Sequence, residues 1–340
     1  MKPILQVRDL SVEIPLAAGM LKPVREVSFH VQPGETLAIV GESGCGKSLT
    51  SLALMGLLPK AASCTALELR FAGQPLLGLS ERALSDLRGN RMAMIFQDPM
   101  TSLNPGFTIG NQLMEVYLRH RQSSRREAQE RAVFLLEKVG ISAAASRLGQ
   151  YPHQLSGGLR QRVMLAMGLM CEPELIIADE PTTALDVTIQ AQILLLLAEL
   201  QKEFQMALIL ITHDLGVVAR VADRVAVMYA GQIVETGTVA EVFSNALHPY
   251  TQGLLECIPI PGKTPPGTHL GSIPGIVPNL LGNLQGCLFR DRCRYAHQDC
   301  ASSPMIAVQE LHAGRNYRCL LPEDLSARKS QHASNTSERA

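Results

Sequence analysis

The chain has 340 residues, a length that suits about two domains, and 46% of them are hydrophobic, enough for a sizeable core. Lysine plus arginine and aspartate plus glutamate both number 31, so the net charge is zero and nucleic-acid binding through a basic surface is not expected. No apolar run approaches the roughly 20 residues of a membrane span, and the N-terminus does not resemble a signal peptide. We therefore expect a cytosolic protein that would act at a membrane only through a partner that spans it.

The N-terminal part of the sequence predicts short strands at residues 4–7, 10–14 and 27–31. The last of these ends at Pro33 and Gly34, a typical turn signal. We expect the three strands to form a small sheet beside the region that follows.

The sequence GESGCGKS at residues 41–48 fits the pattern G-x-x-x-x-G-K-[ST] of nucleotide-triphosphate loops. An apolar run precedes it at residues 36–40, and a helical pattern follows at residues 49–58. Glycines let backbone N–H groups point at phosphate oxygens, and the helix N-terminus adds a positive dipole end. In such a loop Lys47 reaches the β- and γ-phosphates and the Ser48 hydroxyl ligates Mg²⁺. A plain glycine-rich turn is the alternative, but it does not account for the strand and the helix on either side.

Strands and helices alternate over the rest of the first 245 residues. Apolar strands are predicted at residues 67–71, 92–96, 175–178, 207–211 and 224–229, and helices at residues 109–140, 163–170, 189–201 and 239–243. This alternation predicts a mostly parallel sheet wrapped by helices, which binds ligands at the carboxyl ends of its strands. Gln97, Asp179, Glu180 and His213 each follow a strand, as the phosphate loop does, so we expect them to meet at one edge.

Two further segments suit nucleotide chemistry. Asp179 is placed to help hold Mg²⁺, and Glu180 to orient and polarise the attacking water. Ser156, Gly157 and Gly158, at the start of a predicted helix, form a second nest for an anion. Because one chain has only one γ-phosphate to bind, the second nest is expected to serve the nucleotide of a facing subunit.

The C-terminal part differs in character. Residues 259–286 are rich in proline and glycine and read as a linker, and the tail at residues 326–340 is predicted to be disordered. Between them lie four cysteines with the spacing C-x5-C-x6-C-x18-C. They are Cys287, Cys293, Cys300 and Cys319. Four thiolates suit an iron–sulfur cluster or tetrahedral zinc, and free thiols are the third possibility.

Taken in order, these motifs resemble those of the ATPase subunits of ABC transporters. Residues 41–48 look like Walker A, Gln97 like the Q-loop glutamine, Ser156–Gly158 like the signature, residues 175–179 like Walker B, Glu180 like the catalytic glutamate, Asp186 like the D-loop aspartate and His213 like the switch histidine. The resemblance implies an α/β fold of the ABC P-loop type: a mostly parallel sheet core, a small antiparallel β-subdomain and a helical subdomain. It implies an ATPase domain at residues 1–255 with its helical subdomain at about 100–170, and a linker with a cysteine module at residues 256–325.

The resemblance also implies a set of site residues. Catalysis would involve Glu180, His213, Gln97 and Lys47. ATP would be bound by Gly41, Glu42, Ser43, Gly44, Cys45, Gly46, Lys47, Ser48, Leu49, Gln97, Asp179, Ser156, Gly157, Gly158 and Asp186. Ser48, Gln97 and Asp179 would hold Mg²⁺.

Four segments narrow the resemblance to the dipeptide and oligopeptide importers. They are residues 96–105, 151–158, 178–188 and 248–251. This group implies a [4Fe-4S] cluster on Cys287, Cys293, Cys300 and Cys319, with zinc as the alternative. It implies a second ABC ATPase subunit, in a heterodimer or a homodimer, two transmembrane permease subunits and an extracytoplasmic solute-binding protein, at the cytoplasmic face of a bacterial inner membrane.

Other readings stay open at this point. Nickel importers and antimicrobial-peptide uptake systems share much of the pattern. A soluble ABC ATPase outside transport is a rival from another class, although it would carry two cassettes, a long coiled coil or a basic surface. The sequence departs from the family near Ile14, where an aromatic residue that stacks on adenine is usual.

Overall fold

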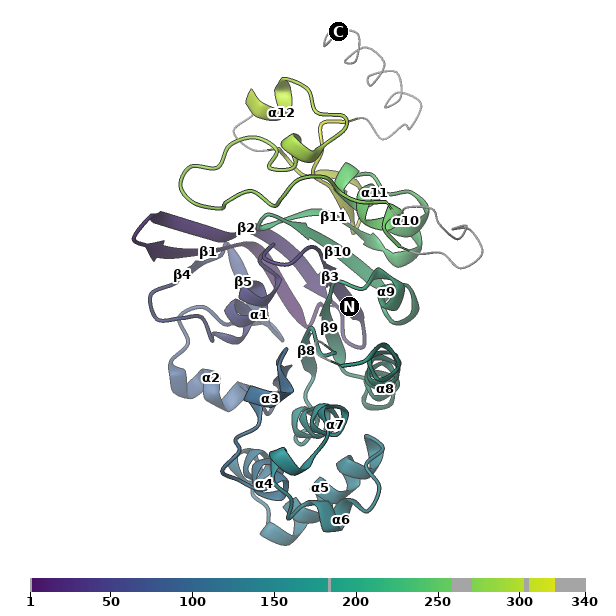
Figure 1. Cartoon of the computed structure of the whole chain (residues 1–340). Helices are drawn as coiled ribbons and strands as arrows, with labels where there is room; N and C mark the ends of the chain where they lie inside the picture. The colour runs from purple at the N-terminus through teal and green to yellow at the C-terminus, as the bar shows by residue number, and fades with distance from the viewer. Residues whose placement is uncertain (1, 183–184, 259–270, 303–305, 322–340) are drawn as a thin grey trace.

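The computed structural model describes residues 2–182, 185–258, 271–302 and 306–321 (Figure 1). Its strands are β1 (Leu5–Leu16), β2 (Gly19–Val31), β3 (Thr36–Val40), β4 (Ser63–Thr65), β5 (Glu68–Phe71), β6 (Gln74–Pro75), β7 (Met92–Ile95), β8 (Leu175–Asp179), β9 (Ala207–Thr212), β10 (Arg224–Tyr229), β11 (Gln232–Thr238), β12 (Gln309–His312) and β13 (Arg315–Tyr317). Its helices are α1 (Lys47–Met55), α2 (Glu81–Leu87), α3 (Pro99–Ser102), α4 (Ile109–His120), α5 (Arg125–Lys138), α6 (Ala144–Arg147), α7 (Gly157–Gly168), α8 (Val187–Phe204), α9 (Leu215–Val221), α10 (Val239–Ser244), α11 (Pro249–Glu256) and α12 (Asp299–Ser302), with 3-10 turns η1 (Pro152–Gln154) and η2 (Arg290–Arg292).

The large sheet runs in the order β12-β13-β11-β10-β3-β9-β8-β7. From β10 to β7 every neighbouring pair is parallel. Strands β3, β8 and β9 are buried at every residue, which is why their sequences read as unbroken apolar runs. The parallel order brings the carboxyl ends of β3, β7, β8 and β9 to one edge, and the predicted α/β class is confirmed.

A smaller antiparallel sheet, β2-β1-β5-β6 with β4 paired to β1, packs against the large one. The prediction of two separate strands at residues 4–7 and 10–14 was wrong, because β1 is continuous through both. Its register shifts between Val7 and Leu10, where Asp9 has a φ of +52° and donates its N–H to Ser28 Oγ at 2.9 Å. This bulge absorbs the extra residue without ending the strand.

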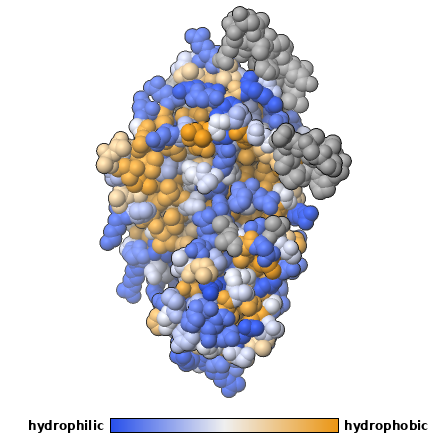
Figure 2. Space-filling view, in the orientation of Figure 1, coloured by the Kyte–Doolittle hydropathy of each residue, from blue (hydrophilic) through white to orange (hydrophobic). Residues whose placement is uncertain are grey.

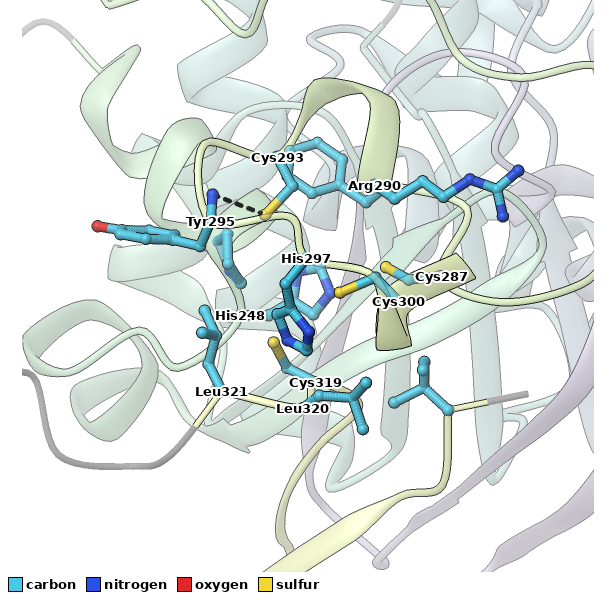
Figure 3. A pocket seen from close by; sticks show the side chains of 13 residues that line it. His248, Cys287, Arg290, Cys293, Tyr295, His297, Cys300, Cys319, Leu320 and Leu321 are labelled. Carbon is cyan, nitrogen blue, oxygen red and sulfur yellow. Dashed lines mark hydrogen bonds between the residues drawn. The ribbon is translucent and has the colours of Figure 1, made fainter. Parts of the chain in front are cut away.

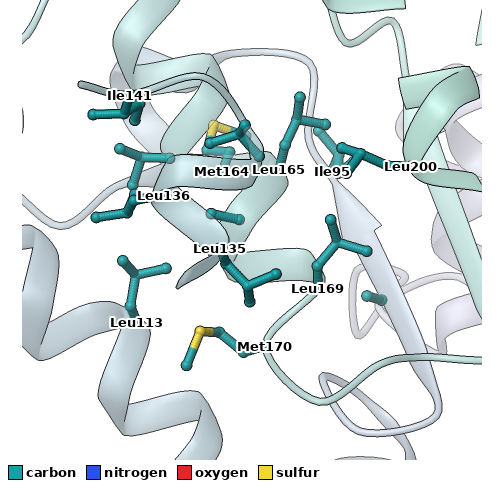
Figure 4. Close-up of a cluster of buried hydrophobic side chains, with 14 of the residues drawn as sticks. Ile95, Leu113, Leu135, Leu136, Ile141, Met164, Leu165, Leu169, Met170 and Leu200 are labelled. Carbon is teal, nitrogen blue, oxygen red and sulfur yellow. The ribbon is translucent and has the colours of Figure 1, made fainter. Parts of the chain in front are cut away.

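Helices α3 to α7 form the lower part of the molecule in Figure 1. The predicted helix at residues 109–140 is in fact two helices, α4 and α5. The break is fixed by a capping box, in which Ser124 and Glu127 satisfy each other's backbone N–H groups at the start of α5. The two helices and α7 pack around a core in which Leu113, Leu135 and Leu165 have no exposed surface, and β7, β8, β9 and α8 add side chains to the same core (Figure 4).

The C-terminal part packs on the large sheet rather than standing apart. Strand β13 pairs antiparallel with β11, and β12 with β13. Phe289 joins the buried cluster that contains Val40 of β3, Val227 of β10 and Tyr250 of α11. The predicted tail at residues 326–340, and residues 259–270 of the predicted linker, lie outside the described residues.

Figure 2 shows apolar side chains over the upper left of one face, where Figure 1 draws β1 and β2. Leu16 and Met20, at the turn between these strands, are 49% and 38% exposed. Within the described residues, no helix combines the length and the apolar character that crossing a bilayer requires.

Candidate nucleotide site and a cysteine-lined cavity

The phosphate loop connects the end of β3 to the start of α1. Gly46 precedes the helix with a φ of +105°, and a Cβ at this position would lie 2.2 Å from the Pro23 carbonyl oxygen. A Cβ on Gly41 would lie 2.1 Å from the carbonyl oxygen of Met228. The neighbouring backbone of β2 and β10 therefore demands glycine at both positions.

Lys47 opens α1 with its side chain only 4% exposed. Its ammonium group donates to the carbonyl oxygens of Gly41 at 2.8 Å and Glu42 at 3.1 Å. It lies 3.7 Å from a carboxylate oxygen of Glu180. The ammonium is thus folded back over the loop, where the N–H groups of the helix N-terminus also gather.

Asp179 is the last residue of β8 and is 4% exposed. Its carboxylate accepts hydrogen bonds from the hydroxyls of Ser48 at 3.1 Å and Ser51 at 3.4 Å. Burial raises the pKa of Asp179, and the Ser48 hydrogen bond opposes that shift. A buried carboxylate beside a serine hydroxyl provides the oxygen ligands that Mg²⁺ prefers.

Glu180 follows directly and has a φ of +44°, a conformation that a residue with a side chain adopts at a cost. Its N–H donates to the Ile211 carbonyl oxygen at 3.0 Å, which holds this backbone against β9. The side chain accepts from Gln97 Nε2 at 3.1 Å and lies 3.7 Å from His213 Nδ1. The strand ends of β7, β8 and β9 thus bring Gln97, Glu180 and His213 together beside Lys47, as the sequence predicts.

Ser156, Gly157 and Gly158 lie at the start of α7, so this helix begins six residues before its predicted start. A Cβ on Gly158 would lie 3.2 Å from Ile189 of α8. Asp186 caps α8 by accepting from the Ile189 N–H at 3.0 Å. Within the described residues, no hydrogen bond or ion pair joins residues 156–158 to the phosphate loop.

The four C-terminal cysteines line a single cavity (Figure 3). The lining residues are His248, Pro249, Cys287, Phe289, Arg290, Cys293, Tyr295, His297, Cys300, Ile306, Cys319, Leu320 and Leu321. Burial raises the pKa of Cys287 to about 11 and that of Cys293 to about 12, with the neighbouring cysteines adding to both shifts. Within the described residues, no three histidine, cysteine or acidic side chains are arranged to hold a single metal ion.

Two residues outside the nucleotide motifs also contact the phosphate loop. The Tyr250 hydroxyl accepts from the Glu42 N–H at 2.9 Å, and Arg292 forms two hydrogen bonds with the Glu42 carboxylate. They lie 208 and 250 residues downstream of Glu42. Tyr250 belongs to the segment 248–251 that narrows the family resemblance, but no spacing or periodicity in the sequence predicts that Tyr250 or Arg292 contacts Glu42.

Two family descriptions match the chain. The ABC transporter family matches residues 24–183, which include β3, the phosphate loop and Asp179. The family described as oligopeptide/dipeptide transporter, C-terminal region, matches residues 234–300, which include three of the four cysteines.

Similar proteins extend over nearly the whole chain. The dipeptide transport ATP-binding protein DppD of Escherichia coli (strain K12) is 49% identical over 326 residues, covering 96% of this chain and 98% of that protein. The oligopeptide transport ATP-binding protein OppD of Bacillus subtilis (strain 168) is 51% identical over 312 residues, covering 91% and 87%. A putative peptide import ATP-binding protein of Brucella melitensis is 49% identical, covering 96% and 99%.

Solved structures support the fold. The dimeric structure of the bacterial ABC transporter cassette MJ0796 is 25% identical with a TM-score of 0.62, covering 69% of this chain and 98% of that one. CbiO1 of Clostridium perfringens, part of an ABC transporter complex, is 28% identical with a TM-score of 0.61, covering 72% and 92%. With these matches, and with a site in which the predicted residues meet, the chain belongs to the ATPase subunits of ABC transporters, in the group of the dipeptide and oligopeptide importers.

Proposed function

We propose that this ATPase energises the import of dipeptides or oligopeptides. The observation that carries the proposal is the near full-length similarity to proteins named for peptide import, which extends through the cysteine-bearing C-terminal region. The site itself supports only the energising step. Its substrate is MgATP, whereas the solute would be bound by partner subunits.

For the nucleotide, we assign Lys47 to the β- and γ-phosphates, with the backbone N–H groups of residues 41–49 around them. Ser48, Asp179 and Gln97 would hold Mg²⁺, and the Ser48–Asp179 hydrogen bond of 3.1 Å brings two of these ligands together. When bound, Mg²⁺ offsets the charge of the phosphates.

Glu180 would orient and polarise the attacking water, and His213 would contact the γ-phosphate from the adjacent strand end. The positive φ of Glu180 supports this role, because strain of this kind persists where the surrounding structure fixes a residue for function. The 3.1 Å hydrogen bond from Gln97 keeps the Glu180 carboxylate inside the site.

The second nest is proposed to act across a dimer. Ser156, Gly157, Gly158 and Asp186 would face the nucleotide held by the Walker A loop of a second ABC ATPase subunit, in a heterodimer or a homodimer. Among the described residues, no hydrogen bond or ion pair joins residues 156–158 to this chain's own phosphate loop, which supports the assignment. ATP would favour the closed dimer, and hydrolysis would release it, as in any ligand-driven population shift.

The permease contact is proposed at the Gln97 region and the helical segment that follows it. Phe96, Met100 and Phe107 expose 41%, 59% and 54% of their surface within twelve residues, an apolar group that suits a partner helix. Two transmembrane permease subunits would hold the ATPase at the cytoplasmic face of the inner membrane. An extracytoplasmic binding protein would deliver the peptide.

The test is uptake of labelled di- and tripeptides and longer oligopeptides in cells that carry the protein or its Lys47→Ala form. Loss of uptake in the variant, at unchanged permease levels, is the expected result, and the peptide length that is lost identifies the solute class. If peptide uptake is unchanged while nickel or antimicrobial-peptide uptake falls, the proposed solute is wrong and the ATPase assignment stays.

A [4Fe-4S] cluster on Cys287, Cys293, Cys300 and Cys319 is proposed as a second feature. The donor set suits such a cluster, because four thiols line one cavity, and zinc is the alternative on the same four side chains. The cluster would supply an anionic group that these cysteines hold as thiolates. Protein purified without oxygen is expected to be brown, with iron and acid-labile sulfide that Cys300→Ser removes. A colourless protein with stoichiometric zinc contradicts the proposal.

A further inference from the structure

Every polar group of Glu42, the second residue of the phosphate loop, forms a hydrogen bond. Its N–H donates to the Tyr250 hydroxyl at 2.9 Å, and its carbonyl oxygen accepts from Lys47 at 3.1 Å. Its carboxylate accepts two hydrogen bonds from Arg292, at 2.6 and 2.9 Å. Tyr250 and Arg292 both belong to the C-terminal third of the chain. That region therefore contacts the phosphate loop through residues that are not part of the nucleotide motifs.

Arg292 is itself fixed in place. It ends the turn η2, directly before Cys293, and its side chain is only 4% exposed. Its remaining N–H groups donate to the carbonyl oxygens of Pro274 at 2.8 Å and Ile273 at 3.3 Å, and to the Tyr229 hydroxyl at 3.4 Å. A guanidinium held on so many sides cannot follow the carboxylate if the loop moves.

Two aromatic rings complete the surroundings of the guanidinium. Its central carbon lies 5.7 Å from the ring centroid of Tyr229 and 5.9 Å from that of Phe289. Phe289 also contacts the ring of Tyr250, at 5.4 Å between centroids, and lines the cysteine cavity. The two residues that grip Glu42 therefore share a packed aromatic group with the cysteine-bearing segment.

The charge of Glu42 explains why this grip matters for ATP. A carboxylate in a loop that cradles a triphosphate repels its ligand unless a cation offsets it. Arg292 supplies that cation in a bidentate pair and draws the carboxylate toward the C-terminal region.

We propose that Arg292 is a positioning residue for MgATP. It neutralises Glu42 and fixes the backbone of the phosphate loop, and it links the cysteine-lined segment to the nucleotide site. This role does not depend on which solute is imported or on what the cysteines hold.

The test is equilibrium binding of a fluorescent ATP analogue with Mg²⁺ to the full-length chain, with KM and kcat for ATP measured alongside. Arg292→Met is expected to weaken binding about tenfold and to raise KM with little change in kcat. Arg292→Lys keeps the charge but not the fork, so an intermediate loss is expected. Arg294→Met is the matched control, because Arg294 lies in the same segment but pairs with the exposed Glu256. It should change affinity less than about twofold.

Glu42→Gln separates positioning from a general packing defect. If Arg292 acts by offsetting the Glu42 charge, Arg292→Met should weaken ATP binding less than about threefold in the Glu42→Gln background. Melting temperatures of all variants without nucleotide show whether each is folded. The proposal is overturned if Arg292→Met binds MgATP as the unmodified chain does, or if its loss is the same with and without the Glu42 carboxylate.

Discussion

The ion pair between Glu235 of β11 and Arg315 of β13 is expected to anchor the C-terminal part to the ATPase core. The Arg315 guanidinium donates to a Glu235 carboxylate oxygen at 2.6 Å, and to the carbonyl oxygens of Asn245 at 2.7 Å and Thr236 at 3.1 Å. The side chain of Arg315 is 4% exposed and that of Glu235 is 0% exposed. The Glu235 carboxylate also accepts the N–H groups of Leu247 and His248, so it joins three segments of chain.

Arg315→Met tests this anchor, because it keeps much of the side-chain volume and removes the charge and every donor. Breaking a buried pair by removing one partner costs about 3–5 kcal/mol, because the other charge is left buried without its partner. At about 2–4 °C per kcal/mol, a melting temperature at least about 6 °C lower is expected. The two N–H groups that remain on Glu235 keep the expected loss toward the lower end.

The assay is thermal unfolding of the full-length chain without nucleotide, since bound ATP would add its own stabilisation. Arg294→Met serves as the exposed comparison, because its pair with Glu256 is 49% and 54% exposed and is worth at most about 1 kcal/mol. A melting temperature for Arg315→Met within about 2 °C of that control would refute the reasoning.

Three further predictions concern the ATPase part. Gly46→Ala should abolish MgATP binding, measured with a fluorescent analogue, because its Cβ would lie 2.2 Å from the Pro23 carbonyl oxygen; normal binding would contradict the glycine requirement. Glu180→Gln should keep MgATP binding and lose phosphate release, and undiminished turnover would remove Glu180 from its proposed role. Leu113 has no exposed surface, so Leu113→Ala should lower the free energy of unfolding by about 2–5 kcal/mol. Leu118 lies on the same helix and is 37% exposed, so Leu118→Ala should lower it far less. Equal losses would contradict the packing of α4.

Local patterns in the sequence were enough to predict the parts of the fold that depend on local chemistry. The apolar runs that became β3, β8 and β9 are buried on both faces, so their composition alone marks them as central strands. The residues that follow them meet because parallel strands end at one edge, which is why the sequence alone predicts that Glu180 and His213 lie together.

Hydrophobic patterns in the sequence do not predict features that depend on particular hydrogen bonds or on a folded neighbour. A bulge at Asp9 joins two apparent strands into one, and a capping box at Ser124 divides one apparent helix into two. Strands β12 and β13 are short and half-polar, and they exist because β11 offers an edge rather than because their sequence favours a strand. Pairing of that kind depends on the folded neighbour and cannot be found in a local window.

Two arginines join the C-terminal part to the ATPase core through ion pairs, and we expect one to affect stability and the other ATP binding. Arg315 donates to Thr236, Glu235 and Asn245, none of which belongs to the phosphate loop, so its loss should lower the melting temperature and leave the ATP affinity of the folded protein unchanged. Arg292 lies on Glu42 in the phosphate loop, so its loss should weaken ATP binding in a protein that is still folded. If both variants instead lost stability and affinity together, the C-terminal part would act as one cooperative unit with the nucleotide site, and the separate role of Arg292 would not stand.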